Sequence, residues 1–130
     1  NGDTEEWLYE NSGPESLALL FSSGSTQLSP RAKEVLAKVA TVLNDKPEME
    51  VLVEGHTDNV PIKGRLAKRF PTNAELSQAR AESARQALSD GGMAADKISA
   101  KGHADSRPIA SNSTAEGRQK NRRVEIVVGQ

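Results

Sequence analysis

The chain has two histidines, His56 and His103, which are the first candidates for a metal ligand or a general base. Both follow predicted strands, so their rings could approach each other, but neither belongs to a paired metal-ligand motif and the chain has no cysteine. His56 stands two residues before Asp58, which places both side chains on one side of an extended chain. No Gly-x-Ser-x-Gly turn and no glycine-rich nucleotide motif is present. We therefore expect His56 to hydrogen-bond the loop that it begins rather than to act as a general base.

Polar side chains are also concentrated in three short segments of the chain. They are residues 55–59 (GHTDN), 73–81 (NAELSQARA) and 117–126 (GRQKNRRVEI). Each segment has a purely structural explanation. Asp58 can cap a turn, and the basic residues of the third segment can form a solvated face. Arg80 can pair with Glu75 or Glu82 on its own helix. Residue types alone leave these roles open beside a binding site.

Three helices are predicted to position these segments. Ser29-Pro30 is a typical helix start, and apolar residues then recur at helical spacing as far as Asn44. Thr72 and Glu75 have the spacing of a capping box and open a second helix, which ends at Gly91-Gly92. Ser113 and Glu116 form a weaker capping box before a short third helix. The first two helices are long enough to cover a sheet.

The predicted strands alternate with these helices. Apolar or alternating residues indicate strands at 17–21, 49–54, 97–101 and 123–128, and residues 55–71 form a predicted loop with a basic centre. The order strand, helix, strand, helix, strand, short helix, strand is typical of an α/β (α+β) sandwich in which helices cover one sheet.

Length and composition exclude several classes of protein. The 130 residues suit one domain, which we assign to 17–130, with 1–16 as a linker or edge strand. Lys and Arg (17) nearly balance Asp and Glu (18), so the basic surplus of a nucleic-acid binder is missing. Aromatic residues make up 3% of the chain, too few for a platform that stacks bases or flat cofactors. We expect neither a cofactor nor a nucleic-acid partner.

Taken together and in this order, the three polar segments resemble the OmpA-like family of peptidoglycan-associating domains. The run from Val53 to Pro61 and the Leu76-Ser77-x-x-Arg80-Ala81 signature carry most of the resemblance. Phe21 to Ser25 with Leu28, Pro108-Ile109-Ala110 with Asn112, and residues 121–126 also match. The similarity extends from about Leu17 to Val128. It implies a βαβαβ(α)β fold with a mixed four-stranded sheet covered by helices.

The resemblance implies a non-catalytic domain that binds peptidoglycan. The family's ligand is the diaminopimelate residue of the stem peptide, whose free end carries an ammonium and a carboxylate on one carbon. Asp58 matches the family's aspartate for the ammonium, and Arg80 matches its arginine for the carboxylate. Asn73 and Arg122 match further polar positions of the pocket. Asp58 and Arg80 are therefore expected to face one cleft.

The sequence departs from the family at several positions near this pocket. Gly24 and Val60 occupy ligand-binding positions but lack polar groups that some relatives have there. Ala74 stands where many relatives have tryptophan, and Ala104 where many have glycine. The basic loop 63–70 varies in length among relatives. We expect it to be solvated; the alternative is that its four cations add weak, salt-sensitive contacts along the wall. These changes concern the rim and the affinity of the pocket more than the class of ligand.

The family also suggests where such a domain works. Relatives are periplasmic parts of outer-membrane or other envelope proteins, so membrane attachment is expected only through an N-terminal anchor or barrel outside this chain. The expected partner is the peptidoglycan stem peptide, and the oligomeric state stays open. The alternative function is a protein–protein interaction module of an envelope complex that does not bind the wall.

Overall fold

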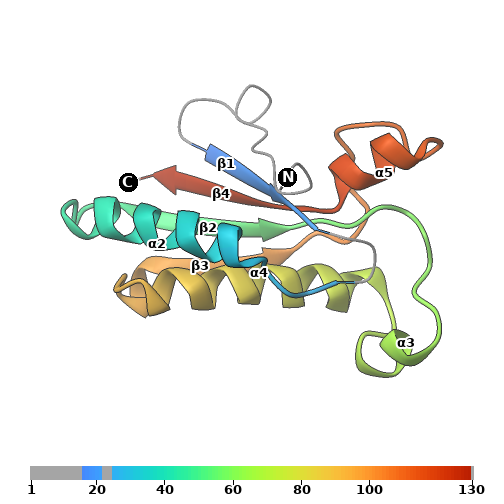
Figure 1. The fold of residues 1–130 in the computed structure, drawn as a ribbon, viewed down its shortest axis with the longest axis horizontal. Helices are drawn as coiled ribbons and strands as arrows, with labels where there is room; N and C mark the ends of the chain where they lie inside the picture. The colour runs from blue at the N-terminus through green and yellow to red at the C-terminus, as the bar shows by residue number, and fades with distance from the viewer. Residues whose placement is uncertain (1–15, 22–24, 130) are drawn as a thin grey trace.

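The computed structural model describes residues 16–21 and 25–129 of the chain, whose arrangement is shown in Figure 1. The elements in chain order are β1 (Ser16–Leu20), α2 (Pro30–Asn44), β2 (Glu50–Gly55), α3 (Arg65–Arg69), α4 (Asn73–Asp90), the 3-10 helix η2 (Ala95–Lys97), β3 (Ile98–Gly102), α5 (Ala115–Asn121) and β4 (Arg123–Gly129). The predictions made for residues 1–15 and for Gly24 lie outside the described residues.

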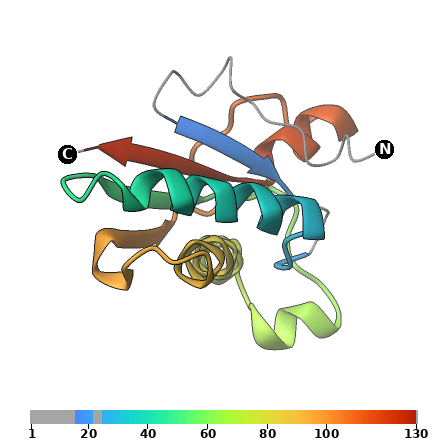
Figure 2. The ribbon, with the colours of Figure 1, turned by 60° about the vertical axis from the view of Figure 1, so that its left-hand side comes forward.

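The strands form one mixed sheet with the order β1-β4-β2-β3. β2 and β3 are parallel, and α4 connects them, whereas β4 pairs antiparallel with both β2 and β1. Helices α2 and α4 lie side by side on one face of the sheet, as Figures 1 and 2 show. This is the mixed α+β architecture that the alternation of elements predicts.

The core forms between these two helices and the sheet. α2 begins as predicted, because the Ser29 hydroxyl accepts a hydrogen bond from the Ala32 N–H at 3.0 Å and Pro30 needs no partner for its nitrogen. Leu36 and Ala40 of its apolar stripe are fully buried, whereas Val42 at the edge of the stripe is exposed. The stripe packs against strand residues such as Val53 and Ile126. Burial of this aliphatic surface is the main force that holds the helices to the sheet.

The predicted loop at 55–71 contains a helix that the sequence analysis missed. α3 covers Arg65–Arg69 and projects from the body of the molecule near the start of α4 (Figures 1 and 2). It has five residues and no buried side chain, so it lacks the long apolar stripe by which helices are recognised. A signal was present, since Ile62, Leu66 and Phe70 recur every four residues.

Several predicted boundaries shift by one residue. The first strand ends at Leu20, and Phe21 follows it with a buried side chain. The cap of the third helix is Thr114 rather than Ser113, because the Thr114 hydroxyl accepts from the Gly117 N–H at 2.9 Å. The Ser113 N–H instead donates to the Ser111 hydroxyl, within the preceding turn. Because Ser113 and Thr114 both carry a hydroxyl group, either can cap the helix, and the sequence alone does not show which one does.

Within residues 16–21 and 25–129, no helix is long and apolar enough to cross a membrane.

Candidate functional site

A pair of glycines brings helix α4 into direct contact with the ends of two strands. Gly55 and Gly102 stand opposite each other in the register of β2 and β3. A Cβ atom on Gly55 would lie 2.0 Å from the Ser77 carbonyl oxygen, and one on Gly102 would lie 2.4 Å from the Ser77 Oγ. Only glycine permits this approach. As a result, the polar residues that follow β2 lie beside the second turn of α4, which carries Arg80.

Ser77 and Ala104 fix the backbone that leads to the site. The Thr57 N–H donates to the Ala104 carbonyl, and the Ala104 N–H donates to the Ser77 hydroxyl, both at 2.9 Å. Ala104 has a φ of 54°, in the left-handed region that favours glycine. The two hydrogen bonds hold this conformation although the residue has a Cβ. Thr57 and Asp58 are therefore placed relative to α4 by backbone contacts.

The guanidinium of Arg80 is held in the interior of the protein. The residue is 0% exposed, and its Nε donates to the Ser25 carbonyl at 2.8 Å. Its Nη1 donates to the His56 carbonyl at 3.1 Å, and its Cζ lies 5.2 Å from the centre of the Phe21 ring. Two backbone carbonyls and an aromatic ring thus contact the guanidinium. The predicted pairing with Glu75 or Glu82 on the same helix is not among the ion pairs of the described residues.

The charge of Arg80 survives this burial. Burial and the nearby Arg122 lower the pKa of Arg80 to about 10, while Asp58 acts in the opposite direction. The guanidinium is therefore still positive at neutral pH. A rigid, dehydrated cation of this kind binds a carboxylate more strongly than a solvated one does.

Asp58 both caps a turn and joins an ion pair. Its Oδ1 accepts from the Val60 N–H at 3.1 Å, which confirms the turn-capping role. Its Oδ2 accepts from Arg122 Nη1 at 2.8 Å, and Arg122 is fixed in turn by donation from Nε to the Phe21 carbonyl at 3.1 Å. The third polar segment is thus part of the site and not only a solvated face.

These groups line one cavity of about 270 Å³. Five of the six residues predicted to bind ligand border it, namely Asp58, Val60, Asn73, Arg80 and Arg122. Gly24 lies outside the described residues. Asn73 closes one side, since its Nδ2 donates to the Val60 carbonyl at 3.3 Å. The prediction that Asp58 and Arg80 face one cleft agrees with this geometry.

The sequence analysis missed the opposite wall of the cavity. This wall consists mainly of Pro61, Ile62, Lys63 and Leu66, from the loop after β2 and from α3. The loop that was expected to be solvated is therefore part of the site, although Arg65, Lys68 and Arg69 are exposed. The apolar repeat Ile62, Leu66 and Phe70 was the available signal, because apolar residues inside a basic loop need a surface to cover.

A larger cavity of about 550 Å³ lies between α2 and α4 and is the weaker candidate. Its charged lining residues are Lys33 and Asp90. Asp90 Oδ1 accepts from Gln86 Nε2 at 2.8 Å, and Ser83 Oγ donates to the Thr26 carbonyl at 2.7 Å. Several of its polar groups thus bond to one another or to the backbone, whereas the smaller cavity gathers one carboxylate, the buried guanidinium of Arg80 and the partly exposed guanidinium of Arg122.

The two histidines meet, but they do not form the arrangement expected of a catalytic or metal site. Their rings are stacked, with centroids 5.2 Å apart, and His103 Nε2 lies 2.7 Å from Glu54 Oε2. The expectation that His56 hydrogen-bonds the loop through its ring is wrong. Neither ring nitrogen of His56 has a partner among the described residues, and only its backbone bonds to Arg123 and Arg80. In the same residues, no three His, Asp or Glu side chains converge to hold a metal ion.

His56 should make the stability of the domain depend on pH. Burial, with Arg123 and then His103 and Arg107 nearby, lowers the pKa of His56 from 6.5 to about 3. Between these values the unfolded chain binds a proton that the folded one does not. Stability therefore falls as the pH drops below 6.5, by about 2 kcal/mol at pH 5. Urea unfolding of the parent and of His56→Phe at pH 7.5 and pH 5 measures this. Parallel losses in both proteins would contradict it.

The chain matches the model of the OmpA family over residues 20–122. It is 36% identical over 112 residues to Motility protein B from Bacillus subtilis, which covers 85% of this chain and 42% of that protein. It is 40% identical over 110 residues to the peptidoglycan-binding protein ArfA from Mycobacterium bovis, which covers 85% of this chain and 32% of that protein. The chain thus spans less than half the length of either relative.

The fold also matches solved structures. The cell wall anchor of the T6SS from Pseudomonas aeruginosa superposes with a TM-score of 0.75 at 37% sequence identity. The superposition covers 88% of this chain and 81% of that one. The family match, the identities and the shared fold extend over the same part of the chain that carries the cavity. The chain belongs to the OmpA family.

Proposed function

We propose that this domain binds peptidoglycan non-covalently through the diaminopimelate residue of the stem peptide. The observation that carries the proposal is the cavity in which the buried carboxylate of Asp58 lies with two guanidinium groups, that of Arg80, which is buried, and that of Arg122, which is partly exposed. These groups alone leave a surplus of one positive charge. A ligand that brings an ammonium and a carboxylate on one carbon satisfies both signs of charge within a small space.

Each charged residue has a distinct role in this proposal. The Asp58 carboxylate, which already accepts from Arg122 and Val60, has lone pairs left for the ligand ammonium. Arg80 receives the ligand carboxylate, and Arg122 holds Asp58 in place through their 2.8 Å ion pair. Asn73 and Val60 form the adjoining wall. Gly24, the residue before Ser25 in the sequence, stays a proposed contact from the resemblance.

The names of the relatives support the wall as the ligand and the cell envelope as the site of action. ArfA is a peptidoglycan-binding protein, and the solved neighbour from Pseudomonas aeruginosa is a cell wall anchor. By analogy, this domain holds an envelope protein to the wall from the periplasmic side. It acts by binding, because the described residues that line the cavity supply charged recognition groups.

A sedimentation assay with purified sacculi tests this function. The domain is expected to sediment with diaminopimelate-type sacculi, and an excess of soluble diaminopimelate stem peptide should release it. Sacculi that have been stripped of stem peptides by an amidase serve as the matched control and should not retain it. A domain that stays in the supernatant, or that binds the stripped sacculi equally, would refute the proposal and favour a protein–protein interaction module.

A further inference from the structure

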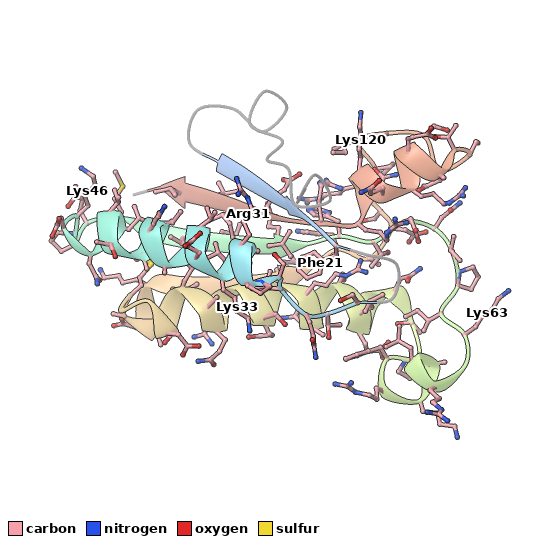
Figure 3. The ribbon with its side chains drawn as sticks, viewed as in Figure 1. Phe21, Arg31, Lys33, Lys46, Lys63 and Lys120 are labelled. Atoms are coloured by element: carbon pink, nitrogen blue, oxygen red, sulfur yellow. The ribbon has the colours of Figure 1, made fainter. Side chains whose placement is uncertain are left out.

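The residues that line the cavity differ in exposure and polarity between its base and its mouth. Arg80 and Asp58, at its base, are 0% and 6% exposed. Ile62 and Leu66 are half-buried along its wall, and Lys63 is exposed. Figure 3 shows the Lys63 side chain extending from the loop between β2 and α4 into solvent, whereas Phe21 lies in the interior. The site thus presents buried charges, then an apolar surface, and then one exposed cation.

Lys63 is a cation for which the described residues supply no counter-charge. No carboxylate of the described residues lies within 4 Å of its ammonium, while the carboxylate of Asp58 is paired with Arg122. With Lys63 included, the cavity carries three cationic side chains and one carboxylate. A ligand whose first carboxylate is bound by Arg80 still leaves Lys63 unmatched. This favours a ligand with a second carboxylate, separated from the first by an aliphatic spacer.

We propose that Lys63 binds the free α-carboxylate of the glutamate that precedes diaminopimelate in the stem peptide. This inference rests on the proposed function. The methylene arm of diaminopimelate lies on Ile62 and Leu66, which removes apolar surface of both from water. The arm leads from the charged base to the mouth, where the peptide leaves the cavity and the glutamate carboxylate meets the lysine. Lys63 is thereby a specificity residue that distinguishes a free glutamate carboxylate from its amide.

The test is a thermodynamic cycle in which the parent protein and one variant are each titrated with two peptides. The ligands are the tripeptide L-Ala-γ-D-Glu-meso-diaminopimelate and the same peptide with its glutamate α-carboxylate amidated. Their affinities for the parent and for Lys63→Gln are measured by calorimetry at low ionic strength. Because exposed ion pairs are weak, we expect Lys63→Gln to lose about threefold in affinity for the free acid. It should bind the amide as the parent does. Added salt should reduce the difference.

Lys68→Gln provides the matched control. Lys68 lies in α3, is exposed and does not line the cavity, so its replacement changes the net charge equally. It should leave both affinities unchanged. Equal losses in the two variants, or a Lys63→Gln loss that persists with the amide, would overturn the assignment of Lys63 alone. A parent domain that binds neither peptide would overturn the proposed function and this inference with it.

Discussion

An Asp58→Asn variant is expected to bind the diaminopimelate stem peptide about 30- to 3000-fold more weakly than the parent. Asparagine preserves the shape of the side chain and can still accept from the Val60 N–H. It removes the negative charge that the ligand ammonium needs, and it removes the ion-pair partner of Arg122. Truncation of one partner in a desolvated charge pair typically costs about 2–5 kcal/mol, which gives this range. Calorimetric titration with the stem peptide measures it.

The Asp58 variant should remain folded, but with lower stability. The Arg122 guanidinium loses a 2.8 Å ion pair while it keeps its bond to the Phe21 carbonyl, so a cost of about 1–3 kcal/mol is expected. Asp105→Asn is the matched control, because Asp105 is an exposed acid that does not line the cavity. Parent-like affinity in the folded Asp58→Asn protein would show that the ammonium binds elsewhere.

The long elements could be predicted from sequence because their signals are local. A proline after a serine marks the start of α2, and the spacing of Thr72 and Glu75 marks that of α4, whose Thr72 N–H donates to Glu75 Oε1 at 2.8 Å. The short helix α3 was missed because five residues carry too little periodic pattern. Consequently, the wall that it contributes to the cavity was missed as well.

The support of the site depends on contacts that a sequence pattern does not contain. Arg80 was recognised from its motif, but its partners are the carbonyls of Ser25 and His56, and any residue has a carbonyl. The expectation for the His56 ring failed because tertiary packing against His103 removes both nitrogens from the loop and from solvent. Gly55 and Gly102 become informative only when their opposition across two strands is known.

Removal of the ligand carboxylate is expected to have an effect as large as the loss of Asp58. A stem peptide with lysine in place of diaminopimelate keeps the ammonium but offers nothing to Arg80. The guanidinium cannot move away, since Ser25, His56 and Phe21 fix it, and its pKa of about 10 keeps it charged. It would remain in a cavity filled by a ligand that lacks the carboxylate, and loss of that charged contact should cost about 2–5 kcal/mol. Amidation of the same carboxylate should weaken binding for the same reason.

The most direct test of the proposed site is a titration followed by the backbone amide shifts of the domain. Diaminopimelate-type and lysine-type stem peptides of otherwise identical sequence are compared under the same conditions. The diaminopimelate peptide should shift the amides of residues 57–66, 73–80 and 122 in a saturable way, and the lysine peptide should need at least about 30-fold higher concentration. Equal affinity for the two peptides, or saturable shifts confined to residues outside the cavity, would contradict the assignment of this cavity to diaminopimelate.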